Sequence, residues 1–293
     1  HAGNHADVLK HATLVAVLQH LTQKEGALSV VDTHAGAGLY RLDTGEAATS
    51  GEALEGIQKL LNHLNSDGTV TATLPELLKN YLVMLAGFNQ RNGGGKGIKL
   101  YPGSPLIAGH LLRQQDRVMA FEVHPTDHRA LRTTLAQATS DAKLQMDRRN
   151  GFEGVIPLLP PVSRRGLVIC DPSYELKTDY ADVVKLMGES LTRFATGSVL
   201  IWYPIVGRSE AHDLPRKLKN AADKAGKDWL HATLQVRAGS SGQGPGGGLG
   251  ASGVFVLNPP YTLKPQLEEA LPVLVKLLGQ DKHAAQKLES KIR

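Results

Sequence analysis

The segment Asp171-Pro172-Ser173-Tyr174 follows a short apolar run, residues 167–170. The Asp171 carboxylate and the Pro172 carbonyl are two acceptors that can take both hydrogens of an amino group on a flat ring. Tyr174 adds an aromatic face for that ring to stack on, as aromatic side chains do for flipped or single-stranded bases. We therefore predict that Asp171, Pro172 and Tyr174 are the catalytic residues for a base that carries an exocyclic amine.

A second motif, of sequence D-T-H-A-G-A-G, occupies residues 32–38 and directly follows the apolar residues 27–31. It is typical of a first β-strand that turns into a helix, with glycines that let the backbone approach a ligand closely. Arg41 stands where the dinucleotide fingerprint requires a third small residue, so the turn disfavours NAD. It suits S-adenosylmethionine instead, with Asp32 and Gly36 in contact. Taken alone, the motif also fits an ordinary glycine turn.

Two further strands are predicted, over residues 117–121 and 143–146. Glu122 directly follows the first and is placed to hold two ribose hydroxyls. Asn150 and Gly151 come after the second, where the amide side chain can meet the edge of an adenine. In open α/β sheets ligands bind at the carboxyl ends of the strands. All of these polar residues, and the two carboxylates described above, are expected at that one edge.

Composition limits the class of protein. The chain has 293 residues, of which 41% are apolar, enough for one large α/β domain with an insertion or for two smaller domains. No apolar stretch approaches the roughly 20 residues of a membrane span, and no signal peptide precedes the first strand. The one cysteine, Cys170, excludes a disulfide framework and a Cys-rich zinc site. The net charge of +5 favours a polyanionic partner over a membrane.

The chain between the first and second strands is too long for a simple crossover. Leucine spacing within residues 52–96 predicts two helices, and we interpret this span as a helical insertion subdomain. Residues 1–51 and 97–293 then form the main domain, which is predicted to begin with an amphipathic helix over residues 5–22.

Three more strands are predicted, over residues 198–203, near 230–237 and over 254–257. A glycine-rich loop, residues 239–253, joins the last two like a long hairpin, so they should run antiparallel. The sequence N-P-P-Y at residues 258–261 follows the last strand and by its letters alone is a better amine-binding motif than the segment at 171. The direction of its strand places it at the opposite edge of the sheet, so we do not expect it to bind the base.

Histidines at positions 1, 5, 11 and 34 suggest a metal site, but their spacing fits neither H-E-x-x-H nor a pair on one helical face. We therefore predict no metal. His11 and His34 are instead expected at the methionine end of the cofactor, with ordinary helix and turn histidines as the alternative. Ser104 begins a helix and has two equally possible roles, as a cap or as a cofactor contact.

The chain resembles the RlmJ family, the 23S ribosomal RNA adenine-N6-methyltransferases, over nearly its whole length. The most specific segments are residues 1–11, 32–38, 101–105 and 161–167. The resemblance implies an α/β, Rossmann-like methyltransferase fold dependent on S-adenosylmethionine, with a seven-stranded, mostly parallel sheet and a small helical insertion. Together with Asp32 and Gly36 from the glycine turn, the expected cofactor-binding residues are His11, Asp32, His34, Gly36, Ser104, Glu122, Asn150, Gly151 and Asp171.

Three departures from the family pattern stand out. Ser173 replaces the second proline of D-P-P-Y, which loosens the turn and keeps the carboxylate, the carbonyl and the ring. Asn150 stands where an aspartate is common, so an amide oxygen would accept from the adenine without a charge. A segment that carries a tyrosine implicated in RNA contact precedes the position of His1 in the family, so weak methylation with normal cofactor binding is an expectation.

The resemblance further implies that 23S ribosomal RNA, free of ribosomal proteins, is the substrate in the cytoplasm, with no membrane and no obligate protein partner. Two alternatives remain open. A DNA adenine-N6 methyltransferase would use the same residues, although the sequence contains no separate DNA-reading module. A noncatalytic nucleic-acid-binding protein used in the catabolism of external DNA is the other.

Overall fold

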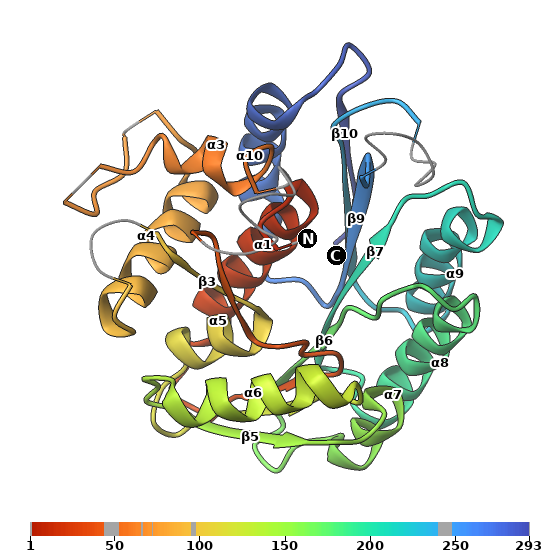
Figure 1. Cartoon of the computed structure of the whole chain (residues 1–293). Helices are drawn as coiled ribbons and strands as arrows, with labels where there is room; N and C mark the ends of the chain where they lie inside the picture. Colours follow the sequence, from red (N-terminus) through yellow and green to blue (C-terminus); the bar gives the residue numbers. More distant parts are fainter. Residues whose placement is uncertain are drawn as a thin grey trace.

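The computed structural model describes residues 2–43, 53–65, 67–71, 73–94, 98–239 and 248–292, and within them eight strands form one central sheet (Figure 1). Along the chain the strands of this sheet are β1 Ser29–Asp32, β4 Arg117–Phe121, β5 Lys143–Asp147, β6 Gly166–Cys170, β7 Ser198–Pro204, β8 Trp229–Gln235, β9 Ala251–Leu257 and β10 Ala285–Lys291. β2 (Leu39–Arg41) and β3 (Leu100–Pro102) pair with each other in a separate ribbon.

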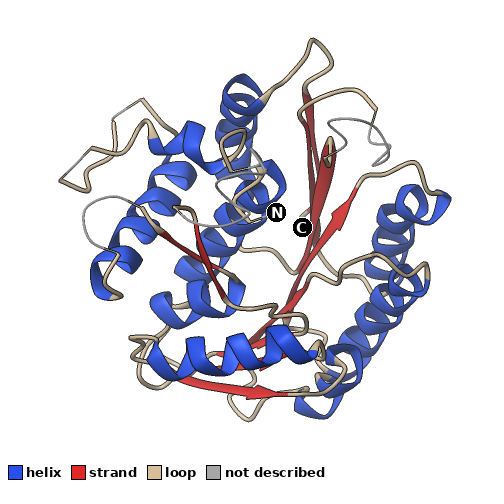
Figure 2. Cartoon of the chain, viewed as in Figure 1, coloured by secondary structure: helices blue, strands red, loops and turns tan. Residues whose placement is uncertain are grey.

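Helices cover both faces of the sheet, so the molecule has three layers (Figure 2). They are α1 His5–Leu21, α3 Ile57–Leu61, α4 Glu76–Arg91, α5 Ser104–Leu111, α6 Pro125–Gln137, α7 Gly151–Gly154, α8 Thr178–Arg193, α9 Ser209–Lys224 and α10 Leu263–Leu278, with a 3₁₀ turn at Ile156–Leu158. Side chains alternate between the two faces of a strand. Leu167 and Ile169 of β6 therefore pack in the core beneath α1, while Val168 and Cys170 pack in the core beneath α8.

Five strands run parallel, in the spatial order β5, β4, β1, β6, β7. The chain builds outward from β1 through β4 to β5, and then returns to place β6 and β7 on the other side of β1. This reversal between β1 and β6 is the point at which open α/β sheets bind ligands. Asp32 ends β1 and Asp171 directly follows β6, so the fold brings both carboxylates to that point.

The remaining three strands are antiparallel to their neighbours: β9 lies between β7 and β8, and β10 pairs with β8 at the edge. The predicted hairpin relation of the last two predicted strands is confirmed. The mostly parallel, Rossmann-like sheet is also confirmed, with one strand, β10, more than the seven expected. None of the helices in the described part of the chain has the length and apolarity that a membrane crossing requires.

Asn258 lies at the amino end of β7, because β9 runs against β7. Its Nδ2 donates to the carbonyls of Ala195 (3.1 Å) and Gly197 (2.7 Å). The carbonyl of Asn258 accepts from Ser198 Oγ (2.9 Å). The N-P-P-Y segment therefore ties loops together at the edge opposite Asp171, as the strand direction predicted.

Helix α1 departs from the expectation of an amphipathic helix. Nearly every residue from His5 to Leu18 is buried, because the sheet covers one side of α1 and α4, α5 and α10 cover the others (Figure 1). A helix enclosed on all sides has no polar face to show. The predicted insertion contains α3 and α4, whose leucines join the same core as α1. Its standing as a separate subdomain stays a prediction.

Candidate active site

A cavity of about 780 Å³ opens at the carboxyl ends of β1, β4, β6 and β7. It brings together seven of the predicted site residues, namely His11, His34, Gly36, Ser104, Glu122, Asp171 and Pro172. The amino end of α1 forms one wall, with Asn4, Asp7 and Lys10. The cavity is therefore shared between the strand ends that the sequence identified and a helix from which it identified His11 alone.

Lys10 lines this cavity and forms ion pairs with two of its carboxylates. Its Nζ donates to Asp171 Oδ2 at 2.5 Å and pairs with Asp7 Oδ1 at 2.9 Å. Burial opposes the charge on Lys10, but the carboxylates of Asp171 and Asp7 outweigh burial and raise its pKa. Burial raises the pKa of Asp171, and Lys10 acts against that rise. For Asp7, burial is outweighed by Lys10, and the pKa falls to about 2.

Asp32 is fully enclosed at the end of β1 and is not among the residues that line the cavity, so its contact with a cofactor stays a prediction. Its Oδ1 accepts from the His34 N–H at 3.2 Å, while its Oδ2 has no hydrogen-bond partner among the described residues. Burial raises the pKa of Asp32 to about 6, and the nearby Ser104 hydroxyl and the His34 N–H oppose the rise. A buried carboxylate oxygen without a donor is costly. Its chemistry fits an ammonium group such as the amino group of S-adenosylmethionine.

Glu122 follows β4 and is held by two backbone donors. Its Oε2 accepts from the Gly36 N–H at 2.8 Å and its Oε1 accepts from the His124 N–H at 2.7 Å. Each oxygen keeps a lone pair, so the carboxylate can still accept from two neighbouring hydroxyls. Gly36 has φ +59°, and a Cβ there would lie 2.8 Å from the Tyr40 hydroxyl oxygen. Glycine is therefore required at this point of the cavity wall.

The two predicted histidines are neutral. Burial, followed by the charge of Lys10, lowers the pKa of His11 to about 3, and burial lowers that of His34 to about 4. His11 Nδ1 lies 3.0 Å from the Tyr101 hydroxyl, and His34 packs edge-on against Phe152. In the described part of the chain no three His, Cys, Asp or Glu side chains are grouped to hold a metal ion.

Asn150 and Gly151 lie outside the residues that line the cavity. The exposed Asn150 side chain accepts from the Phe152 N–H at 2.9 Å and caps α7. Gly151 presses against β1, since a Cβ there would lie 1.8 Å from the Thr33 carbonyl oxygen. The structure thus gives both residues a packing role, and their contact with a cofactor stays a prediction.

Tyr174 does not offer the open ring face that the sequence suggested, and this expectation is wrong for the structure. The side chain is 3% exposed, its hydroxyl donates to the Trp202 carbonyl at 2.6 Å, and its ring packs against Tyr180. The aromatic side chain that does line the cavity is Trp202, one strand away from Asp171 on β7. Lys10 Nζ lies 5.6 Å from the centroid of the Trp202 ring.

The chain is similar to known proteins over nearly its whole length. Residues 25–289 match the family model described as ribosomal RNA large subunit methyltransferase D, RlmJ. The ribosomal RNA large subunit methyltransferase J of Haemophilus influenzae is 43% identical over 278 residues, 95% of this chain and 92% of that protein. The protein of the same name from Escherichia coli is 38% identical over 274 residues, 94% of this chain and 90% of that protein. The crystal structure of protein LPL1258 from Legionella pneumophila superposes with a TM-score of 0.83 at 30% identity, covering 99% of this chain and 98% of that one.

Proposed function

Because the chain belongs to the RlmJ family of ribosomal RNA large subunit methyltransferases, we propose that it methylates the N6 amine of an adenine in 23S ribosomal RNA. S-adenosylmethionine is the methyl donor in this proposal, and the substrate is cytoplasmic RNA free of ribosomal proteins. The observation that carries the proposal is the pair of strand-end carboxylates, Asp32 and Asp171. They lie at the ends of adjacent strands; Asp171 lines the cavity, and Asp32, buried next to the lining residue His34, has an oxygen without a hydrogen-bond partner among the described residues.

The residues present fit the donor. Asp32 Oδ2 is available for its ammonium group, and Glu122 for its ribose hydroxyls. His11 and His34 are neutral, so they add no positive charge beside a sulfonium. When bound, S-adenosylmethionine would supply an electrophilic methyl group at the strand ends.

The amine of the target base is held by Asp171 and the Pro172 carbonyl in this proposal. Lys10 occupies Asp171 Oδ2, which fixes the carboxylate and leaves Oδ1 to accept one amine hydrogen. The Pro172 carbonyl accepts the other, and the nitrogen lone pair is turned toward the methyl group. Asp171 then accepts the proton that N6 releases. Positioning and electrostatics supply most of the acceleration.

Trp202, rather than Tyr174, offers the aromatic face for the base. Trp202 lines the cavity beside Asp171, whereas the Tyr174 ring is enclosed. Tyr174 positions Trp202 through two contacts. Its hydroxyl donates to the Trp202 carbonyl, and its ring packs edge-on against the indole with centroids 6.1 Å apart. Stacking on an aromatic side chain is worth about 1–3 kcal/mol per base.

Methyl transfer from labelled S-adenosylmethionine tests the proposal. Deproteinised ribosomal RNA is expected to acquire N6-methyladenine, while duplex DNA stays unlabelled. Labelled DNA and unlabelled RNA would favour a DNA methyltransferase, and no transfer to either would favour a noncatalytic binding protein.

The Asp171→Ala variant tests the residue roles in the same assay. We expect it to bind S-adenosylmethionine normally and to lose at least about 100-fold in rate, because the amine loses its main acceptor. Glu175→Gln is the matched control, since Glu175 also lines the cavity and is exposed. Normal turnover by Asp171→Ala would contradict the assigned role.

A further inference from the structure

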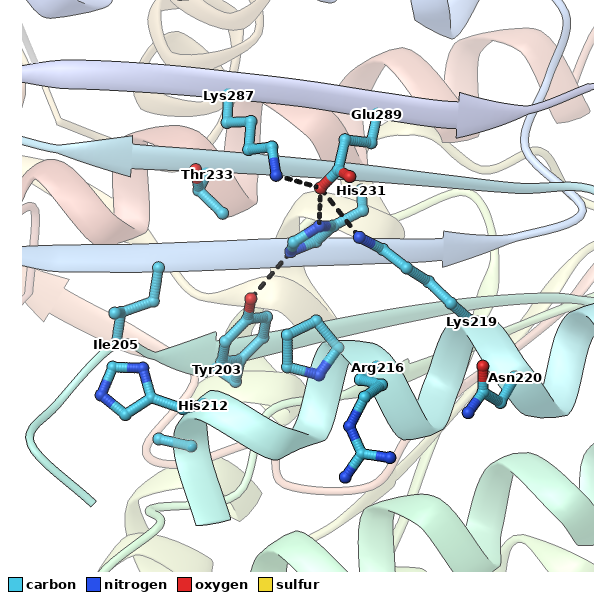
Figure 3. Close-up of a pocket in the computed structure, with 12 residues that line it drawn as sticks. Tyr203, Ile205, His212, Arg216, Lys219, Asn220, His231, Thr233, Lys287 and Glu289 are labelled. Atoms are coloured by element: carbon cyan, nitrogen blue, oxygen red, sulfur yellow. Dashed lines mark hydrogen bonds and ion pairs between the residues drawn. The ribbon is translucent and has the colours of Figure 1, made fainter. Parts of the chain in front are cut away.

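A second cavity, of about 400 Å³, lies on the opposite face of β7, between α9 and the strands β8 and β10 (Figure 3). Trp202 and Tyr203 are neighbours in β7, so their side chains point to opposite faces of the sheet. Trp202 lines the first cavity and Tyr203 lines the second. One strand end therefore serves two cavities.

The floor of the second cavity is a hydrogen-bonded chain that runs from two buried side chains, Tyr203 and His231, to the partly exposed Glu289 (Figure 3). The Tyr203 hydroxyl lies 2.7 Å from His231 Nε2, and His231 Nδ1 lies 3.4 Å from Glu289 Oε2. Because Nδ1 faces the carboxylate, it carries the ring proton, and the Tyr203 hydroxyl donates to Nε2. Burial, followed by Lys219, lowers the pKa of His231 to about 4, so the imidazole is neutral near pH 7.

Positive charge exceeds negative charge in this cavity. Lys219 and Lys287 both pair with Glu289 Oε2, at 2.8 and 3.1 Å, so two ammonium groups face one carboxylate. Arg216 adds a guanidinium at the rim, where Asp213 of the same helix lies 2.8 Å away. The surplus is placed on two elements, α9 and β10, that meet only in the folded chain.

The cavity also offers donors that nothing in the described chain uses. Asn220 and Thr233 line it, and their side chains make no hydrogen bond to a described residue. Neutral donors beside a surplus of ammonium and guanidinium groups are the chemistry that recognises phosphate oxygens.

We propose that this second cavity binds a phosphate ester of the RNA backbone, outside the catalytic cavity. This inference rests on the proposed function. An RNA that places an adenine in the first cavity reaches the second by crossing the loop of residues 205–208, which follows β7. Ile205 of that loop lines the second cavity and Glu175 lines the first. Arg208 of the same loop donates to the carbonyls of Tyr174 (3.0 Å) and Glu175 (3.3 Å), which ties the loop to the segment beside the first cavity.

Paired charge removals test the assignment. Arg216→Gln with Lys287→Gln removes two cations from the cavity, and both side chains are exposed, by 63% and 66%, so the fold should be retained. Lys217→Gln with Lys282→Gln is the matched control, because these exposed lysines remove the same charge outside the lining residues. The affinity for a fluorescein-labelled fragment of 23S ribosomal RNA is measured by anisotropy over a range of NaCl concentrations.

We expect the cavity variant to bind RNA about tenfold more weakly at low salt, with a slope of log K against log salt that is smaller in magnitude by about 1 to 2. The control should stay within about twofold of the wild type. Equal losses in the two variants, or none in the cavity variant, would overturn the assignment. The comparison needs no methyl transfer, so its outcome is independent of the test of the proposed function.

Two further arms identify the source of the phosphate. Methylation of an adenine in an oligonucleotide too short to reach both cavities should be the same in the cavity variant and the wild type, which supports an RNA-backbone site. Binding of AMP or inorganic phosphate that is lost in the cavity variant, while RNA binding is kept, would replace the backbone assignment with a site for free phosphates.

Discussion

In the proposed function, Asp32 makes cofactor binding depend on pH. Burial raises its pKa to about 6, and the ammonium group of S-adenosylmethionine would pair with the ionised form. That form is lost as the pH falls through this value. We expect the affinity for S-adenosylmethionine to be nearly constant above about pH 7 and to fall by up to about tenfold per unit below about pH 6. Isothermal titration calorimetry across this range measures the effect.

The Asp32→Asn variant should bind S-adenosylmethionine more weakly and with a flat pH profile. Asp127→Asn is the control, because Asp127 lines the same cavity without being buried and should keep the wild-type profile. An unchanged pH dependence in Asp32→Asn would show that another group sets it.

Lys10 is the counter-ion of two carboxylates, so its removal should lower the free energy of unfolding. Lys10→Met leaves Asp171 and Asp7 facing each other without a cation inside the protein. Breaking a buried ion pair by removing one partner costs about 3–5 kcal/mol. We expect a loss of this size in urea unfolding at neutral pH, whereas Lys24→Met, at an exposed lysine, should change stability by less than about 0.5 kcal/mol. Similar midpoints for the two variants would contradict the buried ion pair.

At the scale of single residues, the sequence located the polar residues at the ends of strands. It missed the residues from other elements that contact them. Asp32, Glu122 and Asp171 could be found because each follows an apolar run, and the end of the run marks the edge of the sheet. Lys10 lies 161 positions from its partner Asp171, so no local spacing reveals the pair. Trp202 was placed in a strand, but the face on which its ring lies depends on the cores that form on either side.

Elements with strong apolar runs, such as β1, β6 and β7, were predictable because burial on both faces imposes such runs. β10 was not, since its sequence A-Q-K-L-E-S-K is mostly polar. This edge strand is held by backbone pairing with β8 and by the Lys219–Glu289 ion pair from α9. Helix α1 was located correctly and its surroundings were not, because the packing of α4 and α10 over it cannot be read from its own residues.

The short helix α7 is pressed against β1 through Gly151. A methyl group added there would meet the Thr33 carbonyl oxygen at 1.8 Å, so the backbone of one element has to move. We expect Gly151→Ala to destabilise the protein by about 1–3 kcal/mol through overpacking, measured by urea unfolding. Gly188→Ala in α8 is the matched control, since nothing lies within 4 Å and alanine favours the helix by about 0.5–1 kcal/mol. Equal stability of Gly151→Ala and the wild type would show that the contact yields readily.

The whole molecule should lose stability in mild acid. Burial lowers the pKa of His11 to about 3 and those of His34 and His231 to about 4, with the charges of Lys10 and Lys219 adding to the effect for His11 and His231. The unfolded chain binds protons at these histidines below about pH 6.5, and the folded chain does not. Asp32 acts in the opposite direction, because its folded pKa of about 6 lies above the unfolded value. Unfolding near pH 5 therefore takes up about two protons from these four groups.

We expect the free energy of unfolding to fall by about 2–3 kcal/mol for each unit by which the pH is lowered near pH 5. Urea titrations at several pH values measure this slope, and His231→Gln should reduce it by about one proton. A stability that does not change between about pH 6.5 and 5 would mean that the imidazoles are protonated in the folded state.

At the largest scale the mostly parallel, Rossmann-like sheet could be expected from the resemblance, and the enclosure of the sheet could not. The spatial order of the strands, with its switch between β1 and β6, comes from the structure. The second cavity depends on α9, β8 and β10 meeting in space, and its two lysines come from segments 68 positions apart, Lys219 and Lys287. No spacing in the sequence indicates such a site.

The chain contains two tryptophans, one lining the first cavity and the other packed beneath a lysine of the second. Trp202 lines the catalytic one, while Trp229 lies under Lys219, whose Nζ is 5.2 Å from its ring centroid and which lines the other. Replacing either indole by phenylalanine leaves a single tryptophan. The two single-tryptophan variants thus give separate optical reporters, with which the proposed arrival of a base and the proposed arrival of a backbone phosphate can be timed in parallel experiments.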